Sequence, residues 1–353
     1  MPATQAPHRR AGVTAVFNTI AIVGMGLIGG SIWKRLTDMG YPVRGYDINP
    51  QTRAAAREIA AATSNRHADR ILNTIPAAVV GADLVIIAVA TIEVESVLRE
   101  IGATGYRGVL TDVTSIKAPV ENYIRIKHPG TRWVGGHPIV GFERAGFEFS
   151  SSRLLDGCPW VLCIDTAARN STALSDWLST AKLLTTLGYR VMPMNALDHD
   201  VCLARISHIP HLVANAVART AIAGSLSPAA LSLAMAGDSF AQVTEVATTR
   251  PARTAEFCAY NLASLDAELE HLIEQLNQAR HIMRRRGAVE ALSEWFEPAY
   301  TARSRWPVPS TPPMRLSASI DQLLALGRVG GWVTSVRDGE ITVVRPELNI
   351  SQN

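Results

Sequence analysis

A chain of 353 residues is long enough for two domains with cores of their own and a small appendage. Its 47% hydrophobic and 18% charged residues, with a net charge of +3, are typical of a soluble enzyme and argue against a disordered chain or a nucleic-acid partner. Four scattered cysteines form no Cys-x-x-Cys pair, which argues against a zinc or redox motif and fits the reduced thiols of a cytoplasmic protein. No apolar stretch of about 20 residues is uninterrupted, so we expect no transmembrane helix and no membrane partner.

The first 195 residues alternate short apolar runs with helical stretches. After a flexible arm at 1–16, we predict strands at 19–23, 42–47, 84–90, 109–113, 132–135, 160–165 and 189–194, and helices at 29–39, 51–62, 116–127 and 171–187. The segment 84–90 is apolar throughout, which indicates a strand buried on both faces, as in a parallel sheet. This alternation predicts an α/β Rossmann-type doubly wound sheet with right-handed crossovers over 17–195.

The pattern changes after Asn195. Residues 196–300 are almost entirely helix-compatible and predict an all-helical domain, with apolar residues at close to helical spacing between Leu262 and Leu276. Its abundant Ala, Leu and Ile give more apolar surface than a thin domain can bury alone, so we expect a homodimer. We assign 301–353 to a Pro-rich linker and a small C-terminal α/β tail, with a helix at 320–326 and a β-hairpin at 332–344 that turns at Asp338-Gly339.

The first glycine-rich turn has the pattern of a dinucleotide site. Gly24, Gly26 and Gly29, with Leu27 and Ile28 between the last two, fit Gly-x-Gly-x-x-Gly after a strand and at the start of a helix. The glycines permit a tight turn and a close approach to a pyrophosphate, and the helix N-terminus favours its negative charge.

Two further residues are assigned to this dinucleotide site. Asp47 ends the second strand, 18 residues after Gly29, where an acid accepts hydrogen bonds from ribose hydroxyls. Val89, at the end of the apolar strand, is assigned to the same site. Asp47 favours NAD because a carboxylate repels a 2′-phosphate, while the nearby Arg53 keeps NADP open. The alternative is a structural turn followed by a helix-capping aspartate.

Two segments at predicted strand ends carry the candidate chemistry. They are Thr111–Lys117 (TDVTSIK) and Gly135–Glu143 (GGHPIVGFE), and ligands of open α/β sheets bind at the carboxyl ends of the strands. His137 can there accept a hydrogen bond from a substrate hydroxyl, with an ordinary pKa suited to proton acceptance near neutrality. The alternatives are that Thr114 or Ser115 is a helix N-cap and that His137 is a turn residue.

Four segments together resemble the prephenate/arogenate dehydrogenases of tyrosine biosynthesis. They are GMGLIGGS, TDVTSIK, GGHPIVGFERAG with GCPWVL, and ISHIPH, in order over residues 18–260. The resemblance implies oxidative decarboxylation of arogenate or prephenate with hydride transfer to NAD(P). It implies that His137 bonds the ring C4 hydroxyl, that Ser115 bonds His137 and the substrate, and that His211 positions the substrate from a homodimeric helical domain. His208 is as consistent with a packed histidine as with a site residue, and without a carboxylate or cysteine cluster the pair predicts no metal site.

The chain departs from the family at Thr244–Pro251. The family usually carries Thr-Arg-φ-Ala-x-x-Asp-Pro, whose arginine binds a substrate carboxylate, whereas this chain has Glu245 at the arginine position and Arg250 at the acidic one. The alternative is a surface charge exchange without consequence. We hypothesise that both residues bind substrate, that Glu245 pairs with the ammonium group of arogenate, and that Arg250 replaces the missing cation.

Two other functions are compatible with parts of the sequence. Two-domain dehydrogenases of the β-hydroxyacid type rely on a catalytic lysine in the second domain, and no lysine follows Lys182. A non-catalytic NAD-binding sensor would keep the glycine turn but has no need of Ser115 and His137.

Overall fold

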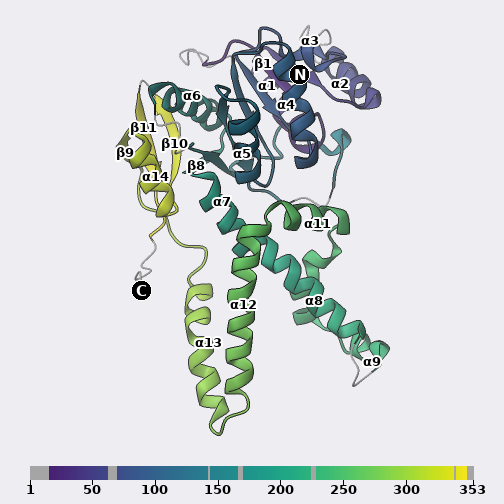
Figure 1. Cartoon of the computed structure of the whole chain (residues 1–353), viewed down its shortest axis with the longest axis vertical. Helices are drawn as coiled ribbons and strands as arrows, with labels where there is room; N and C mark the ends of the chain where they lie inside the picture. Colours follow the sequence, from purple (N-terminus) through teal and green to yellow (C-terminus); the bar gives the residue numbers. More distant parts are fainter. Residues whose placement is uncertain are drawn as a thin grey trace, which may run out of the picture. The chain divides into compact units, whose positions relative to one another are not determined.

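The computed structural model describes residues 16–62, 70–141, 144–165, 170–223, 228–337 and 339–347. These residues divide into two compact units, one of the chain up to Ala196 together with Ser310–Glu347, and one of Leu197–Pro309 (Figure 1). Residues 1–15 of the predicted arm (1–16) and Asp338 lie outside the described residues. The segment Ser310–Glu347, most of the stretch that the sequence assigns to a linker and C-terminal tail (301–353), packs on the first unit.

The first unit begins with a parallel sheet of the predicted Rossmann type. Its five strands have the order β2-β1-β3-β4-β5, which confirms the fold class. The strands are β1 (Ile20–Val23), β2 (Val43–Tyr46), β3 (Leu84–Ile87), β4 (Val109–Asp112) and β5 (Arg132–Val134), and the helices are α1 (Leu27–Asp38), α2 (Pro50–Ala62), α3 (Ile75–Val79), α4 (Val94–Ala103) and α5 (Ala118–Lys127). Strands β1 and β3 each pair in parallel with a neighbour on both sides, and every residue of β3 is buried, as its apolar sequence predicts.

A second, mixed sheet follows in the same unit, with the order β6-β7-β8-β10-β11-β9. Its elements are β6 (Gly136–Pro138), β7 (Pro159–Cys163), α6 (Ser171–Thr186), β8 (Arg190–Met194), β9 (Met314–Ser317), α14 (Ile320–Arg328), β10 (Trp332–Arg337) and β11 (Glu340–Val344). The prediction that 160–165 and 189–194 extend the first sheet is therefore wrong. These strands have partners that the sequence pattern does not name, since β6 pairs antiparallel with β7 and β10 pairs with β8.

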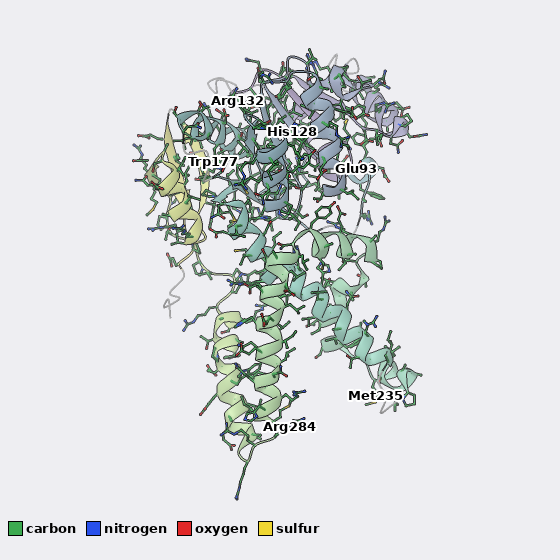
Figure 2. The ribbon with its side chains drawn as sticks, viewed as in Figure 1. Glu93, His128, Arg132, Trp177, Met235 and Arg284 are labelled. Atoms are coloured by element: carbon green, nitrogen blue, oxygen red, sulfur yellow. The ribbon has the colours of Figure 1, made fainter. Side chains whose placement is uncertain are left out.

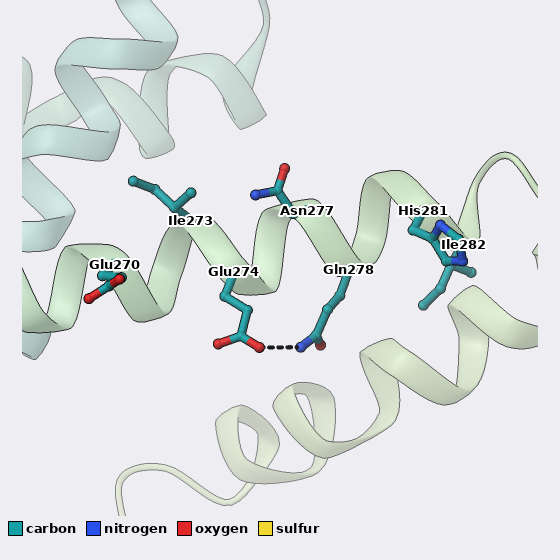
Figure 3. A pocket seen from close by; sticks show the side chains of 7 residues that line it. All are labelled: Glu270, Ile273, Glu274, Asn277, Gln278, His281 and Ile282. Atoms are coloured by element: carbon teal, nitrogen blue, oxygen red, sulfur yellow. Dashed lines mark hydrogen bonds between the residues drawn. The ribbon is translucent and has the colours of Figure 1, made fainter.

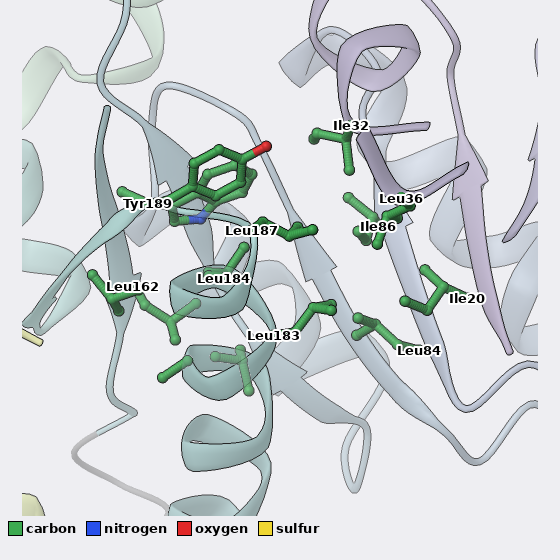
Figure 4. Close-up of a cluster of buried hydrophobic side chains, with 14 of the residues drawn as sticks. Ile20, Ile32, Leu36, Leu84, Ile86, Leu162, Leu183, Leu184, Leu187 and Tyr189 are labelled. Carbon is green, nitrogen blue, oxygen red and sulfur yellow. The ribbon is translucent and has the colours of Figure 1, made fainter. Parts of the chain in front are cut away.

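One hydrophobic cluster connects the two sheets. It contains Ile20 and Leu84 of the first sheet, Leu162 of the second, Leu183 of α6 and Leu36 of α1, all of them buried (Figure 4). Residues of the C-terminal strands, including Val333 and Ile341, belong to the same cluster. Because protein interiors pack densely, this shared core fixes the strand ends of both sheets with respect to each other.

The second unit is helical, as predicted. It consists of α7 (Ala196–Leu203), a five-residue π-helix (Ala204–His208), α8 (Ile209–Ala223), α9 (Ala229–Ala234), α10 (Asp238–Thr244), α11 (Pro251–Tyr260), α12 (Leu262–Ile282) and α13 (Ala288–Ser304). Many of its large apolar side chains are exposed, and Figure 2 labels Met235, which is 79% exposed, together with Arg284 at the far end of α12. A groove runs along α12 past Ile273, Asn277 and Ile282 (Figure 3).

One helical run of the second unit bears on the membrane prediction. Ala196–Ala223 is 28 residues long and contains an 18-residue window with a mean hydropathy of 1.2, which by length and composition alone is enough to cross a membrane, although we expect no such span from the sequence. Two of its polar residues, His199 and Asp200, are 1% exposed and bond each other through Nδ1 and Oδ1 at 2.7 Å. Paired buried polar groups of this kind are common inside folded domains, although only 22% of the window is buried.

Candidate active site

The turn between β1 and α1 has the backbone that its glycines permit. Gly24 has a φ of +94°, and a Cβ there would lie 2.5 Å from the carbonyl oxygen of Ala88. A Cβ at Gly29 would lie 1.9 Å from the carbonyl oxygen of Gly24, so the turn and the helix pack too closely for a side chain. At Gly26 a Cβ would meet nothing within 4 Å. Two glycines are thus required by the fold, and the third borders open space in which a pyrophosphate fits.

The start of α1 is suited to an anion. Gly26 is its N-cap residue and offers no side-chain cap, so the first backbone N–H groups of the helix, including those of Leu27 and Ile28, are available to a ligand. Val89 follows β3 and approaches the same turn, since a Cβ on Gly24 would lie 2.9 Å from its Cγ1. The turn, the helix start and the end of β3 together therefore fit a bound dinucleotide.

Asp47 lies directly after β2 and is bonded to the glycine turn. Its Oδ2 accepts a hydrogen bond from the backbone N–H of Met25 at 2.7 Å, and its Oδ1 accepts one from Asn49 at 2.8 Å. Each carboxylate oxygen keeps a second acceptor site, so bonds to ribose hydroxyls remain compatible with this arrangement. The carboxylate thereby holds the turn in addition to the role predicted for it.

Arg53 bonds the backbone beside Asp47. Its Nη1 donates to the carbonyl oxygens of Asp47 at 2.6 Å and Ile48 at 3.1 Å, and its guanidinium lies 5.9 Å from the ring centre of Tyr46. A guanidinium that donates to carbonyl oxygens of its own chain has fewer N–H groups left for a ligand, so it is a weaker candidate for binding a 2′-phosphate. The geometry therefore favours a cofactor without that phosphate.

His137 occupies the middle of β6, opposite Val161 of β7, and is 8% exposed. Ser115 lies in the loop after β4 and is half-buried. The parallel pairing of β4 with β5 brings the loop 113–117 and the start of β6 to the same edge of the first sheet. The N-cap interpretation of Thr114 and Ser115 is wrong, because α5 begins at Ala118 with Lys117 as its N-cap residue.

Sequence reasoning missed a buried ion pair between Asp112 and Lys117 at this edge. Asp112 is 0% and Lys117 2% exposed, and their side chains bond each other and Thr114. The pair also bonds both peptide groups of Gly136, the residue before His137. A lysine five residues after an aspartate that ends an apolar strand was the available signal, but an isolated lysine in a loop normally indicates a solvated side chain.

The second unit places His208 and His211 against one aromatic ring. His208 is stacked on Phe257 with ring centres 4.6 Å apart, and His211 is tilted against it at 5.0 Å. Nδ1 of His208 lies 3.1 Å from Nδ2 of Asn261, whose amide also donates to the carbonyl oxygen of Asp200. His208 is thus a packed and bonded histidine.

The two histidines differ in their surroundings. Burial lowers the pKa of His208 to about 4, against an opposing effect of Asp200. Burial also lowers the pKa of His211, opposed by a backbone hydrogen bond at Val246, and its Nδ1 is buried without a hydrogen-bond partner among the described residues. Both imidazoles are therefore neutral near pH 7, and His211 retains one unused ring nitrogen.

Glu245 and Arg250 lie on either side of a short helical turn. Glu245 opens the 3-10 segment Glu245–Thr248, and Arg250 immediately precedes α11. Both are exposed within their unit. Glu143 and Phe142 of the GGHPIVGFE segment lie outside the described residues.

A glycine turn at a helix start, an acid after the second strand and a buried histidine at the strand ends define a dinucleotide-dependent oxidoreductase. The chain matches the model of the prephenate dehydrogenase nucleotide-binding domain over residues 34–191, and that of the prephenate dehydrogenase dimerization domain over 195–298. It therefore belongs to the prephenate dehydrogenase family. The first match begins inside α1, so the glycine turn precedes it and supports the dinucleotide site independently.

Relatives and solved structures agree with this assignment. The chain is 26% identical to a prephenate dehydrogenase of Bacillus subtilis over 82% of this chain and 76% of that protein. It is 28% identical to a cyclohexadienyl dehydrogenase of Zymomonas mobilis over 75% of this chain and 88% of that protein. Among solved structures, prephenate dehydrogenase from A. aeolicus in complex with hydroxyphenyl propionate and NAD+ matches with a TM-score of 0.69 and 25% identity, over 82% of this chain and 98% of that chain.

Proposed function

We propose that this dehydrogenase oxidatively decarboxylates arogenate or prephenate with NAD as the hydride acceptor, forming the phenol ring of tyrosine or of 4-hydroxyphenylpyruvate. The observation that carries the proposal is a buried histidine, His137, at the strand ends of a family member whose glycine turn fits a dinucleotide. The geometry of Asp47 and Arg53 supports NAD over NADP.

The residues have distinct tasks in this reaction. His137 accepts the hydrogen bond of the ring C4 hydroxyl and draws on its proton, while Ser115 bonds His137 and the substrate and His211 positions the substrate from the helical unit. NAD+, held by the glycine turn and Asp47, would supply the acceptor for the hydride that leaves C4. The C1 carboxylate departs as CO₂, and the electron pair of the broken C1–carboxylate bond completes the aromatic ring. The protein contributes orientation and removes charge build-up from the C4 oxygen.

An assay that crosses two substrates with two cofactors tests the proposal. Reduced-nicotinamide absorbance is followed with arogenate or prephenate and with NAD or NADP. We expect turnover with NAD and at least one substrate, and a lower kcat/KM with NADP. Absence of turnover in all four combinations from folded protein that binds NAD would favour the non-catalytic sensor.

Arogenate is the substrate that the charges in the second unit favour. Glu245 stands where the family has an arginine, and it offers a carboxylate for the ammonium group that arogenate has and prephenate lacks, while Arg250 supplies a cation five residues later. The carboxylate of Glu245 repels a dianionic substrate that has no ammonium group.

The variant Glu245→Arg tests this preference. We expect the ratio of kcat/KM for arogenate to that for prephenate to fall by about 1–3 kcal/mol in free-energy terms, the range of charge-assisted hydrogen bonds. Glu294→Arg, an equal change of charge at an exposed position of α13, is the control and should leave the ratio unchanged. A wild-type enzyme that strongly prefers prephenate would refute the assignment.

We also propose that the protein is a cytoplasmic homodimer joined through its second unit. The support is the match to a dimerization domain and the apolar side chains that this unit exposes, such as Leu231, Ile273 and Leu276 at 53%, 51% and 57%. The same association accounts for the apolar run Ala196–Ala223 without a membrane. Light scattering after size exclusion measures the mass in solution.

A further inference from the structure

The peptide backbone immediately before His137 is bonded on both sides by two buried side chains. The N–H of Gly136 donates to Oδ1 of Asp112 at 2.9 Å, and the carbonyl oxygen of Gly136 accepts from Nζ of Lys117 at 2.7 Å. Nζ of Lys117 also bonds Oδ2 of Asp112 and, at 2.9 Å, Oγ1 of Thr114. One ion pair therefore bonds both polar groups of a single residue.

The place of β6 in its sheet explains why these bonds are needed. β6 is an edge strand of the second sheet, with β7 as its neighbour there. An edge strand leaves backbone groups without ladder partners, and in a buried position such groups must be bonded. The side chains of Asp112 and Lys117 take the place of the missing neighbour strand and connect the end of β4 to β6.

The atoms around Gly136 pack too closely for a side chain at this position. A Cβ on Gly136 would lie 2.6 Å from the carbonyl oxygen of Asp112 and 2.9 Å from Nε1 of Trp160. A lysine that is 2% exposed is stable only when paired and fully bonded, and here it bonds Asp112, Thr114 and Gly136. Replacing a buried ion pair by well-packed apolar residues is often neutral for stability, so the bonds to Gly136 are what this pair adds beyond its own attraction.

We propose that Asp112 and Lys117 are positioning residues for the dehydrogenase reaction, which together fix the backbone of Gly136 and thereby the imidazole of His137 at the site. This inference rests on the proposed function of His137, and its action is indirect, through the peptide. Displacing a catalytic group by about 1 Å can cost about 100-fold in rate, so a small shift of this backbone has a large effect on turnover.

The experiment uses the full-length protein with the double change Lys117→Met and Asp112→Asn. It removes both charges together, so that no unpaired charge stays buried. The introduced asparagine amide can still accept from the N–H of Gly136, whereas the introduced methionine cannot donate to its carbonyl oxygen. We expect kcat to fall about 10–100-fold, with the affinity for NAD, titrated by fluorescence, close to wild type. The melting temperature should fall, because the carbonyl oxygen of Gly136 loses its donor.

A second ion pair in the same unit serves as the control. Nε of Arg132 donates to Oδ2 of Asp176 at 3.0 Å; the aspartate is buried and the arginine side chain is 46% exposed, so Arg132→Met with Asp176→Asn removes a less buried charged pair elsewhere. We expect this control to keep its kcat. An equal loss of kcat in both double variants, or a loss of NAD affinity parallel to that of kcat, would show that the Asp112–Lys117 pair supports only the fold and would overturn the inference.

A second readout does not depend on activity. In protein labelled at the Cε1 positions of its nine histidines, the signal of His137 is identified by its loss in His137→Asn. We expect this signal to shift in the Asp112/Lys117 variant and to stay in place in the Arg132/Asp176 variant. An unshifted signal with unchanged kcat refutes the positioning role. If the wild type does not turn over any substrate, the proposed function fails, and the shift still decides whether the pair positions the imidazole.

Discussion

The two units of this chain bury their apolar residues to very different extents. Among the described residues, the first unit holds all three hydrophobic clusters of buried residues, whereas Leu203, Ala204, Ala214 and Leu265 are the buried apolar residues of the second. Folded domains obtain most of their stability from such burial. The first unit therefore has a core of its own, and the second is completed by association.

The difference also separates two kinds of polar group. In the first unit, the charged pair Asp112–Lys117 and the carboxylate of Asp47 bond the backbone of the site loops. In the second, His208 stacks on Phe257 and bonds Asn261, and His211 is tilted against the same ring. The glycine turn and its supporting bonds are thus built on the unit with the dense core, whereas the histidines of the second unit belong to a helical unit with few buried apolar residues.

Replacing the candidate base should have the largest effect and tests whether the first unit carries the chemistry. In His137→Asn we expect kcat to fall about 100- to 10,000-fold, the range for a general base, with NAD affinity retained. His128→Asn, a half-buried histidine after α5 that contacts the Tyr123 ring, is the control and should keep its kcat. Steady-state and binding measurements decide, and full activity in His137→Asn would end the proposal.

A charge placed on α12 should dissociate the dimer. The result tests whether the exposed apolar residues of the second unit are buried by association. Ile273→Glu occurs twice in a two-fold interface, so we expect a loss of about 4 kcal/mol per dimer and a monomer by light scattering. Ile126→Glu changes an isoleucine that is 67% exposed in the first unit, compared with 51% for Ile273. The Ile126 variant should keep the mass of the wild type, and dissociation by both would contradict the comparison.

Alanine substitutions at two glycines of one turn should affect different properties, one the stability of the fold and the other the binding of the cofactor. Gly29→Ala places a methyl group against the carbonyl oxygen of Gly24, and we expect it to lower the free energy of unfolding by about 3 kcal/mol. Gly26→Ala meets open space, so the melting temperature should stay unchanged while NAD affinity falls about 10-fold, or 1.4 kcal/mol. Thermal melts and NAD titrations measure both, and unchanged affinity in Gly26→Ala would place the pyrophosphate elsewhere.

Acid should weaken the second unit through His208, which is 1% exposed. Its pKa of about 4 in the folded protein lies below the ordinary 6.5, so the unfolded chain binds the proton more readily. The stabilisation is complete above pH 6.5 and is lost as the pH falls toward 4, by about 3 kcal/mol at 1.36 kcal/mol per unit. Between pH 7 and pH 4, the free energy of unfolding should depend less on pH in His208→Gln than in His281→Gln, a control at an exposed position. Equal slopes in the two variants would exclude His208 as the cause.

Strands and helices of this chain are predictable because their apolar spacing is local. The apolar run 84–90 identifies β3 from the sequence alone, and the glycines identify the turn between β1 and α1. The partners of strands are a different matter, since 160–165 is as apolar as a strand of the first sheet but pairs with β6 and β8. Nothing in those residues specifies which sheet they join.

The same limit holds for the site. His137 and the glycines stand out because their residue types and order have a chemical meaning, and the resemblance adds roles for Ser115 and His211. The bonds from Asp112 and Lys117 to Gly136 and the contact of His208 with Asn261 join residues up to 53 positions apart. Such bonds depend on how the elements meet, and a single sequence carries no signal for them.

Strand β10 meets β8 at Val333 and Val191, and these two valines are separated by the entire second unit. During synthesis the helices of Leu197–Pro309 leave the ribosome before β9, β10 and β11 exist. A nascent chain therefore exposes its apolar helices while β8 still lacks its outer neighbour. A premature stop just after the helical unit would remove under a fifth of the polypeptide, yet it would leave the nucleotide-binding half with an uncovered sheet edge.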